Sequence, residues 1–350
     1  MSRLRVGLVG TGIGSSHAEA YRSLPELFDL AVICDIDEAR ARNLANEFQV
    51  GQVVTSLDAL CALDRIDVID ICTPPNLHIS QALQALAAGK HVVVEKPLAA
   101  SLHDADRLIA AEAASDRRVM PIFQYRFGHG LQKLKQLIAA GIPGRPYVAT
   151  IETHWRRYAS YYDIPWRGKW ATELGGALLG HAVHAHDLLT YVFGPIRSVY
   201  CRATTMVNDI EVEDTAAAAL EMENGALVTL SVTLGASDEM SRERFVFSGL
   251  TAESNRSPYA SSGDPWVFTA DSPDIKAQID AELASFQPLP EGFPGQLWRF
   301  YHAIQDGSQL PVTLSDARRS LELATAMYDS MRTGQAVQLP IGQEHKLRCV

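Results

Sequence analysis

Short apolar runs alternate with amphipathic segments along the first third of the chain. The segments between the runs place apolar residues at helical spacing, as in EARARNLANEF and HISQALQALAAG. The runs themselves are rich in β-branched residues, which is typical of strands buried on both faces: LRVGLVG (4–10), DLAVICD (29–35), VIDICT (68–73) and HVVVEKP (91–97). This alternation predicts an α/β fold, with a doubly wound parallel sheet of the Rossmann type over residues 1–122.

The pattern changes after residue 122. A helix is predicted in GLQKLKQLIAAG, and later runs such as DTAAAALEME and GALVTLSVTL alternate with a period of two. Such strands suit a large, open, mostly antiparallel sheet with one face exposed or covered by a partner. Residues 251–295 are rich in Ser, Pro, Gly and Asp and are predicted to be irregular. A final helix over 315–333, with Ser315 as N-cap and Gly334 as its stop, completes a predicted second domain of residues 123–350.

Length and charge narrow the functional classes. A chain of 350 residues exceeds what one core usually serves, so two domains are expected. The 31 Lys and Arg against 41 Asp and Glu give a net charge of −10, which argues against nucleic-acid and anionic-membrane partners. No apolar run approaches the roughly 18 residues of a membrane-spanning helix. We therefore expect a cytoplasmic protein that acts on small molecules.

The cysteines point to a reducing compartment and to no metal cluster. All five are scattered, without a CxxC pair, so neither a disulfide framework nor a zinc site is predicted. They are Cys34, Cys61, Cys72, Cys201 and Cys349.

A glycine-rich turn follows the first predicted strand. Gly10, Gly12 and Gly14 precede a predicted helix, where backbone amides and the helix N-terminus attract a pyrophosphate. The third glycine comes one residue earlier than in GxGxxG, and Ser15 occupies the usual position. Because serine is small, it still permits close packing of the helix on the strand.

Asp35 ends the second predicted strand, 25 residues after Gly10. A carboxylate there can bind both ribose hydroxyls of an adenosine and repel a 2′-phosphate, which favours NAD over NADP. The alternative is that Asp35 only caps the next helix.

Lys96 ends the run HVVVEKP, and an ammonium at the end of a buried strand is costly unless it has a role. Beside an oxidised nicotinamide, which is cationic, its pKa would be depressed toward neutrality. The alternative is that Lys96 reaches solvent with Glu95 as its ion-pair partner.

Three histidines and an aspartate lie close together in GGALLGHAVHAHDLL (175–189). His181 and His184 are three residues apart and are expected on one helix face, and Asp187 can hydrogen-bond His184. His186 is expected to be a structural histidine with its hydrogen bonds satisfied. A metal site is an alternative, with Glu152, His154 and Glu173 as conceivable further ligands.

Taken together, these motifs resemble those of the Gfo/Idh/MocA family of glucose–fructose oxidoreductases and inositol dehydrogenases. The glycine turn, Asp35, CTPPNLH, EKP, YRF (125–127) and the histidine segment occur in the family's order and spacing over almost the whole chain. The resemblance implies a Rossmann domain followed by an α/β domain whose open sheet pairs in homodimers or homotetramers. It also implies oxidation or reduction of a secondary alcohol with NAD(P).

The resemblance implies a site in which Lys96 orients and deprotonates the substrate hydroxyl, together with an aspartate and a histidine four residues apart. The histidine falls on His184, but the aspartate's place falls on Gly180, and His181 is expected to take over part of that role or to bind a substrate hydroxyl. The expected catalytic residues are Lys96, His184 and His181, without a metal. The expected cofactor contacts are Gly10, Thr11, Gly12, Ile13, Gly14, Asp35, Thr73, Pro74, Asn76, His78, Glu95 and Lys96.

The segment HWRRYASYYDIPWRGKWATELGG (154–176) is dense in aromatic and basic residues. Aromatic faces stack on sugar rings and basic side chains donate to hydroxyls, although such residues also populate subunit interfaces. With Arg126 and the two histidines, the expected substrate contacts are Trp155, Arg156, Tyr161, Trp166, Arg167 and Lys169.

The leading hypothesis is an NAD-dependent dehydrogenase of a sugar, polyol or cyclitol, with Lys96 and His184 handling the hydroxyl proton. A redox-neutral lyase or glycosidase that retains its NAD is the first alternative, because Gly180 lacks a carboxylate. A non-catalytic sensor of NAD and sugar is the second.

Overall fold

The computed structural model describes residues 2–342, and the chain forms two compact units. The first comprises residues up to Phe123 together with Phe293–Arg318, and the second comprises Gln124–Gly292 and the chain from Arg319. The division after Phe123 lies beside the expected boundary at 122. Residues 293–318, which we expected in the second domain, belong instead to the first.

Helix α10 (Gly292–Asp306) explains this difference. Its buried Gln296 accepts a hydrogen bond from the Phe123 backbone N–H at 3.0 Å and donates to the Pro121 carbonyl at 2.7 Å. Tyr301 packs edge-on against Phe28 and donates to the Ser2 carbonyl. These hydrogen bonds join residues that lie 173 to 299 positions apart in the sequence, so no local pattern could predict them.

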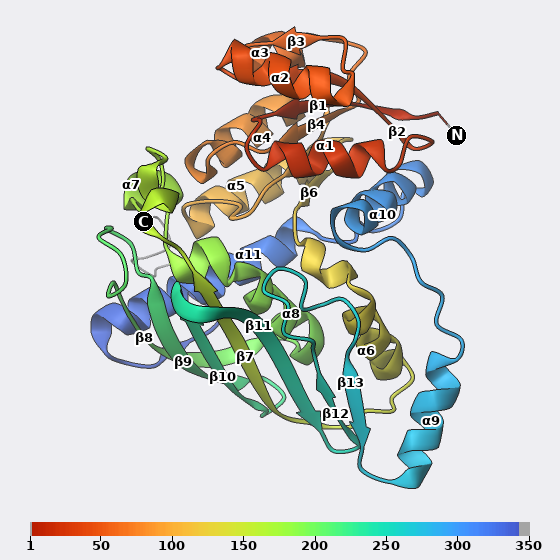
Figure 1. Ribbon diagram of the computed structural model, residues 1–350, viewed down its shortest axis with the longest axis vertical. Helices are drawn as coiled ribbons and strands as arrows, with labels where there is room; N and C mark the ends of the chain where they lie inside the picture. Colours follow the sequence, from red (N-terminus) through yellow and green to blue (C-terminus); the bar gives the residue numbers. More distant parts are fainter. Residues whose placement is uncertain (1, 343–350) are drawn as a thin grey trace. The chain divides into compact units, whose positions relative to one another are not determined.

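The first unit is built on a six-stranded parallel sheet in the order β3-β2-β1-β4-β5-β6 (Figure 1). Its strands are β1 (Leu4–Val9), β2 (Phe28–Cys34), β3 (Val53–Val54), β4 (Val68–Ile71), β5 (His91–Val94) and β6 (Val119–Pro121). Its other helices are α1 (Gly14–Arg22), α2 (Glu38–Phe48), α3 (Leu57–Cys61), α4 (His78–Ala87), α5 (Leu102–Ala113) and the 3₁₀ turn η1 (Pro75–Leu77). The order reverses between β1 and β4, and in open α/β sheets ligands bind at the carboxyl ends of the strands at such a switch point.

The second unit holds an eight-stranded sheet in the order β13-β12-β11-β7-β10-β9-β8-β14, antiparallel except for the β7–β10 pair. The strands are β7 (Pro146–Arg156), β8 (Ile196–Thr204), β9 (Thr215–Met222), β10 (Leu227–Thr233), β11 (Gly235–Phe247), β12 (Leu250–Glu253), β13 (Val267–Ala270) and β14 (Val337–Gln338). The two alternating runs DTAAAALEME and GALVTLSVTL form an antiparallel hairpin of β9 and β10, with Gly225 at a φ of +85° in its turn.

The helical elements of this unit include α8, which packs against β7. They are η2 (Gln124–Phe127), α6 (His129–Ala139), η3 (Ala159–Asp163), α7 (Trp170–Glu173), the π-helical turn η4 (Ala177–His181), α8 (Val183–Phe193), α9 (Pro273–Leu283) and α11 (Leu314–Thr333). No described helix has both the length and the apolar character needed to cross a bilayer.

Two local predictions were wrong. The segment 251–295 is irregular only in part, because it contains most of β12, all of β13 and α9, whose Ser272 caps a helix that begins at Pro273. Helix α11 is capped by Thr313 rather than Ser315. The Thr313 hydroxyl accepts the Asp316 N–H, and the Asp316 carboxylate accepts the Thr313 N–H, which is a reciprocal capping box. Gly334, at a φ of +68°, ends the helix as predicted.

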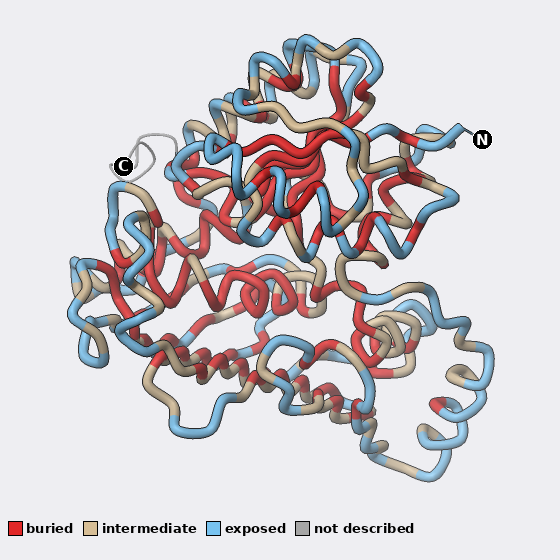
Figure 2. The backbone as a smooth tube through the Cα atoms, turned by 45° about the horizontal axis from the view of Figure 1, so that its top comes forward, coloured by how far each residue is buried: buried red, intermediate tan, exposed pale blue. Residues whose placement is uncertain are grey.

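The buried parts of the backbone run mainly through the central strands of each sheet and through α8 (Figure 2). Cys34, Cys61, Cys72 and Cys201 are free thiols, and Cys349 lies outside the described residues. Glu243 on β11 is an exception to the apolar interior, at 1% exposure. Its Oε1 accepts a hydrogen bond from the Ser261 hydroxyl at 3.0 Å, and its Oε2 has no hydrogen-bond partner among the described residues.

Burial raises the pKa of Glu243 from 4.5 to about 7, because desolvation outweighs the hydrogen bonds of Ser261 and Ser254. The folded state therefore favours the protonated acid, and this stabilisation is full below the ordinary pKa and is lost as the pH rises through about 7.

We predict that the Glu243→Gln variant does not lose this stability as the pH rises, because glutamine does not ionise. Between about pH 5 and pH 8, the free energy of unfolding of the variant should rise relative to wild type by on the order of 1–3 kcal/mol. Urea denaturation at both pH values measures the difference. If the free energies of unfolding of wild type and variant changed with pH in parallel, this would contradict the raised pKa of Glu243.

Candidate active site

At the switch point of the first unit, the glycine turn after β1 lies directly against the backbone that follows β4. Gly10 has a φ of +90°, and a Cβ there would lie 2.7 Å from the Cys72 carbonyl oxygen. A Cβ at Gly14 would lie 2.8 Å from a methyl group of Leu8, so Gly14, and not Ser15, is the residue that lets α1 approach the sheet. Nothing lies within 4 Å of a Cβ at Gly12. The turn is therefore open on the side where a pyrophosphate would meet the backbone N–H groups and the N-terminus of α1.

Asp35 directly follows β2 and is 8% exposed. Its Oδ2 accepts hydrogen bonds from the Thr11 N–H at 2.9 Å and the Thr11 hydroxyl at 2.6 Å. Burial acts to raise its pKa, but these hydrogen bonds and that of the Asp37 N–H outweigh it, so the pKa is lowered and the carboxylate is ionised. Asp37, rather than Asp35, caps α2 by accepting from Ala39 and Arg40. The capping alternative for Asp35 is thereby excluded.

The loops after β4 and β5 are tied together by His78, which is 1% exposed. Its Nδ1 lies 2.8 Å from the Pro97 carbonyl, and its Nε2 lies 2.8 Å from the Thr73 carbonyl. His78 thus joins CTPPN to EKP, and its expected contact with a cofactor stays a prediction. In the same region Glu95 is 4% exposed and Lys96 is half-buried.

These residues fit the dinucleotide expected from the sequence. The open turn at Gly12, the helix N-terminus behind it and the ionised Asp35 all belong to the carboxyl edge of one sheet. Together they provide amide donors for a pyrophosphate and an acceptor for ribose hydroxyls.

The histidine segment does not form the single helix that we predicted. His181 ends the π-helical turn η4, whereas His184 lies in the first turn of α8. The ring of His184 is stacked on Tyr125, with centroids 4.4 Å apart and planes 11° apart. His181 lies edge-on against Trp155, and its Nε2 is 3.3 Å from the Tyr161 hydroxyl. Each histidine is therefore oriented by a different aromatic partner.

Glu213 holds the start of this segment in place. Its carboxylate accepts the N–H groups of Gly176 and Leu178 and the hydroxyl of Tyr328. A Cβ at Gly176 would lie 1.8 Å from the Glu213 carbonyl oxygen, which explains the second glycine of the GG pair. Burial raises the pKa of Glu213 to about 7, since desolvation outweighs these hydrogen bonds. Sequence reasoning missed this role, because Glu213 lies more than 30 residues after the turn that it anchors.

A cluster of aromatic and basic side chains surrounds His181. The Tyr161 hydroxyl contacts His181 and accepts a hydrogen bond from Arg167, whose guanidinium lies over the Tyr161 ring. Arg157, which we did not predict, lies over the rings of Trp155 and Tyr161. Of the expected substrate contacts, the structure thus gathers Trp155, Tyr161 and Arg167 at one histidine.

Other expected substrate contacts lie elsewhere. Arg156 follows Trp155 on β7, where side chains alternate between faces, and it donates to the Gly235 carbonyl. Arg126 is 4% exposed and forms a bidentate ion pair with Asp187, with nitrogen–oxygen distances of 2.7 and 2.5 Å. Lys169 is exposed and precedes α7, and Trp166 lies under the Arg167 guanidinium.

The structure also corrects two expectations, one about the conceivable metal ligands on β7 and one about the hydrogen bonds of His186. Glu152 and His154 were conceivable metal ligands, but they alternate with the buried residues of β7 and contact Arg242 and Ser231 instead. His186 is fully buried as a structural residue should be, yet neither ring nitrogen has a hydrogen-bond partner among the described residues. Desolvation lowers its pKa to about 3, so the ring is neutral.

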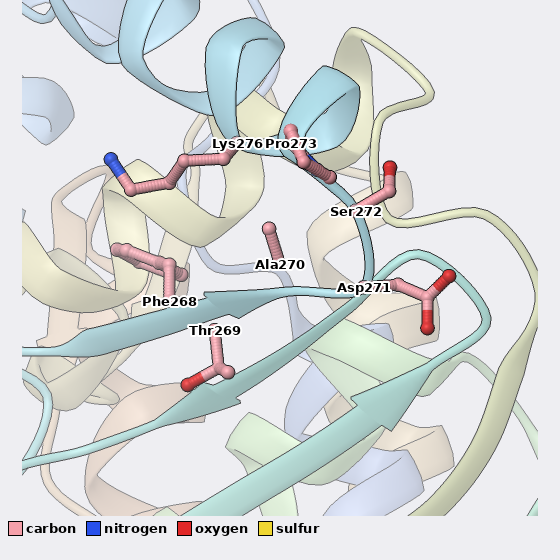
Figure 3. A pocket seen from close by; sticks show the side chains of 7 residues that line it. All are labelled: Phe268, Thr269, Ala270, Asp271, Ser272, Pro273 and Lys276. Atoms are coloured by element: carbon pink, nitrogen blue, oxygen red, sulfur yellow. The ribbon is translucent and has the colours of Figure 1, made fainter.

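A surface pocket of about 450 Å³ lies where β13 meets α9 (Figure 3). Its lining contains none of the residues expected at the site, so it is not the candidate active site. The lining residues are Phe268, Thr269, Ala270, Asp271, Ser272, Pro273 and Lys276.

Comparison with known families and structures agrees with this geometry. Residues 4–123 match the model of the oxidoreductase family with an NAD-binding Rossmann fold, and residues 131–252 match the GFO/IDH/MocA C-terminal domain. The chain belongs to the Gfo/Idh/MocA family of oxidoreductases.

Named relatives cover much of the chain. The D-glucoside 3-dehydrogenase of Escherichia coli is 25% identical over 97% of this chain and 98% of its own length. The myo-inositol 2-dehydrogenase of Thermotoga maritima is 28% identical over 64% of this chain and 66% of its own. The crystal structure of the WlbA dehydrogenase from Bordetella pertussis, in complex with NADH and UDP-GlcNAcA, is 30% identical. It covers 97% of this chain and 100% of that chain, with a TM-score of 0.85.

Gly180 is the position where the family resemblance implies an aspartate. A Cβ at Gly180 would meet nothing closer than Glu173 Oε1 at 3.8 Å and the Gly175 carbonyl at 3.9 Å. The position therefore has room for a side chain, but its nearest neighbour is a carboxylate. Glu173 is 4% exposed, lies 3.6 Å from Arg167 Nη1 and accepts the Gly168 N–H.

We predict that Gly180→Asp destabilises the protein through repulsion from Glu173, whereas the isosteric Gly180→Asn does not. At neutral pH the aspartate variant should be less stable by about 1–3 kcal/mol, because the new, partly buried carboxylate would meet the like charge of the buried Glu173. The gap should shrink at mildly acidic pH as one carboxyl takes up a proton. Thermal unfolding of both variants checks this, and equal stability at neutral pH would refute it.

Proposed function

We propose that this protein is an NAD-dependent dehydrogenase that transfers a hydride between a secondary alcohol of a sugar, polyol or cyclitol and nicotinamide. The observation that carries the proposal is the shared edge of the six-stranded sheet, where the open glycine turn, the ionised Asp35 and Lys96 all follow strand ends. The substrate class is supported by relatives named as dehydrogenases of myo-inositol and D-glucosides. The aromatic and arginine side chains around His181 also suit a hydroxyl-rich ring.

In this proposal, Lys96 and His184 handle the hydroxyl proton. Bound NAD supplies the hydride acceptor. Lys96 donates a hydrogen bond that orients the hydroxyl, and the His184 imidazole accepts its proton, since an imidazole exchanges protons readily near neutral pH. The Tyr125 ring holds the plane of the His184 imidazole. His181 binds a second substrate hydroxyl beside Tyr161 and Arg167.

The preference for NAD over NADP follows from Asp35. Its carboxylate is ionised, and a 2′-phosphate beside it would meet like charge.

A homo-oligomer formed through the eight-stranded sheet is also proposed. The outer face of this sheet exposes Val148, Leu227 and Tyr200, with Val148 and Leu227 in direct register. Apolar side chains on a sheet face are typical of a surface that a second subunit covers.

A redox-neutral reaction is the second candidate, and Gly180 is the observation that favours it. Retained NAD would then be reduced and reoxidised within one turnover, with elimination or hydrolysis between the two steps.

We predict that the purified protein reduces NAD in the presence of a sugar, an inositol or a UDP-linked sugar acid, followed by NADH absorbance. Lys96→Ala should lower kcat/KM by roughly 10² to 10⁴-fold, because the substrate hydroxyl loses the hydrogen bond that orients it for proton transfer. The dissociation constant for NAD should change only a few-fold.

Two outcomes would redirect the proposal. Product formation without net NADH, and with NAD retained through gel filtration, would favour the redox-neutral reaction. Wild-type turnover by Lys96→Ala would refute the role of Lys96.

We further predict that Asp35→Asn shifts the cofactor preference toward NADP. The amide keeps the shape of the side chain and removes its charge, so affinity for NADP should rise about tenfold while affinity for NAD falls. Fluorescence titration with both dinucleotides measures the shift. An unchanged ratio of the two dissociation constants would contradict the role of Asp35.

A further inference from the structure

A buried network of ionisable side chains lies at the end of β5 in the first unit. His17 on α1 and Asp70 on β4 are both 0% exposed, and Glu95, directly after β5, is 4% exposed. His17 Nδ1 lies 2.8 Å from Asp70 Oδ2, and His17 Nε2 lies 3.1 Å from Glu95 Oε1. The imidazole therefore bridges two carboxylates that come from neighbouring strands.

Between two ionised carboxylates, this bridging position requires the doubly protonated ring. A neutral imidazole has one N–H and can donate to one carboxylate only, so its other nitrogen would face oxygen lone pairs. Desolvation acts to lower the pKa of His17, but the Asp70 carboxylate and the Cys72 side chain together outweigh it, and the pKa is raised well above 6.5. The ring is therefore an imidazolium at neutral pH.

The remaining neighbours of the ring supply no competing charge. Tyr21 donates its hydroxyl to Asp70 at 2.9 Å, and the Cys72 thiol, whose pKa is raised by burial, contacts the same carboxylate at 3.5 Å. From α10, the Phe293 ring packs on the imidazole with centroids 4.5 Å apart. Asp70 thus accepts hydrogen bonds from three side chains, which fixes the orientation of its carboxyl group.

Hydrogen bonding explains this geometry better than a metal ion does. Ligand atoms of His17, Asp70 and Cys72 lie within 4.8 Å of one another. Two ligands of a tetrahedral zinc ion, each bonded at about 2.0–2.2 Å, would lie about 3.3 Å apart. The 2.8 Å between His17 Nδ1 and Asp70 Oδ2 is the length of a charge-assisted hydrogen bond.

The network ends on the backbone of Lys96. The second oxygen of Glu95, Oε2, accepts the Lys96 N–H at 3.0 Å. The Glu95 carboxylate thus connects the imidazolium to the residue from which the Lys96 side chain departs. A buried carboxylate without its cation would take up a proton and lose much of its strength as an acceptor.

We propose that His17 is a positioning residue for Lys96: its imidazolium, anchored on Asp70, keeps Glu95 ionised and oriented so that Glu95 fixes the Lys96 backbone. The inference rests on the proposed function, in which Lys96 handles the hydroxyl proton. It adds a second layer of residues, none of which touches substrate, that sets the direction of the lysine.

The test compares two substitutions of His17, each of which keeps a hydrogen-bond donor near the position of one ring nitrogen. His17→Asn can still donate to Asp70 but cannot reach Glu95, whereas His17→Gln can donate to Glu95. We expect His17→Asn to lower kcat about 10 to 100-fold, as loss of an outer-shell partner commonly does, with the dissociation constant for NAD within threefold of wild type. His17→Gln should recover part of the loss.

The control is His91→Gln, which replaces the buried histidine at the first position of β5, the strand that Glu95 directly follows. His91 is 8% exposed and contacts Arg117 and Arg118 rather than Glu95. Its kcat should stay within twofold of wild type. Equal losses of kcat in His91→Gln and His17→Asn would show a general effect on the strand and overturn the proposal.

The pH profile separates positioning from mere support of the fold. In His17→Asn, Glu95 becomes protonated at a higher pH, so the acidic limb of kcat should move upward by about one pH unit or more. An unmoved limb overturns the proposal. If neither His17 variant folds, Glu95→Gln decides: loss of kcat with unchanged NAD affinity supports the proposal, and wild-type kcat overturns it.

A readout without turnover distinguishes this inference from the proposed function. In the ¹⁵N-histidine spectrum of the cofactor-free protein, both ring nitrogens of His17 should stay protonated from neutral to mildly alkaline pH. A His17 that titrates near its ordinary pKa, beside an inactive Lys96→Ala, refutes this inference alone. A fully active Lys96→Ala variant refutes the role of Lys96 in the proposed function, but it does not contradict the assignment of His17 as an imidazolium.

Discussion

The close approach of the first βα turn to the end of β4 is the constraint on which the functional edge of the first unit depends. Gly10 adopts a positive φ within van der Waals contact of the Cys72 carbonyl, and Gly14 lets α1 lie directly on the sheet. Because α1 begins there, His17 falls one turn into the helix and reaches Asp70 and Glu95. The same backbone path that opens the turn toward a pyrophosphate therefore also builds the network behind Lys96.

Buried carboxylates organise both units, but their electrostatic settings differ. In the first unit, Asp70 and Glu95 face an imidazolium, so the charges compensate one another. In the second, Glu213 accepts backbone N–H groups and a tyrosine hydroxyl, and burial raises its pKa to about 7. Paired charges hold a fixed orientation over a wide pH range, whereas an acid with neutral partners changes its protonation near neutrality.

Local patterns predicted the elements that local physics controls. Four strands of the six-stranded sheet (β1, β2, β4 and β5), the alternating strands β9 and β10, and the end of α11 at Gly334 follow from period, turn chemistry and backbone freedom. The errors lie where distant contacts decide. Residues 293–318 join the first unit through Gln296 and Tyr301. Strands β12 and β13 form in a segment whose composition indicates a loop, because β11 provides the edge on which β12 pairs and β12 provides the edge for β13.

The candidate site divides in the same way. Lys96, Asp35, His184 and the glycines were predicted as site residues from residue type, spacing and family resemblance, because each lies at or near the boundary of a predictable element. The contacts that hold the site residues in place were not predicted. They are the stacking of Tyr125 on His184, the hydrogen bonds of Glu213 to the GG turn, and the ion pair of Arg126 with Asp187. One signal was available and unused, namely an aspartate inside the buried strand VIDI, which requires a partner such as His17.

By itself, the sequence determined the class of fold, the order of its elements, and the identity of the groups that can do chemistry, because periodicity and side-chain type are properties of neighbours in the chain. The tertiary structure alone decided the charge of those groups, their orientation and their hydrogen-bond partners. Protonation and hydrogen bonding depend on burial and on atoms contributed by other elements, and in this protein those atoms lie tens to hundreds of residues away.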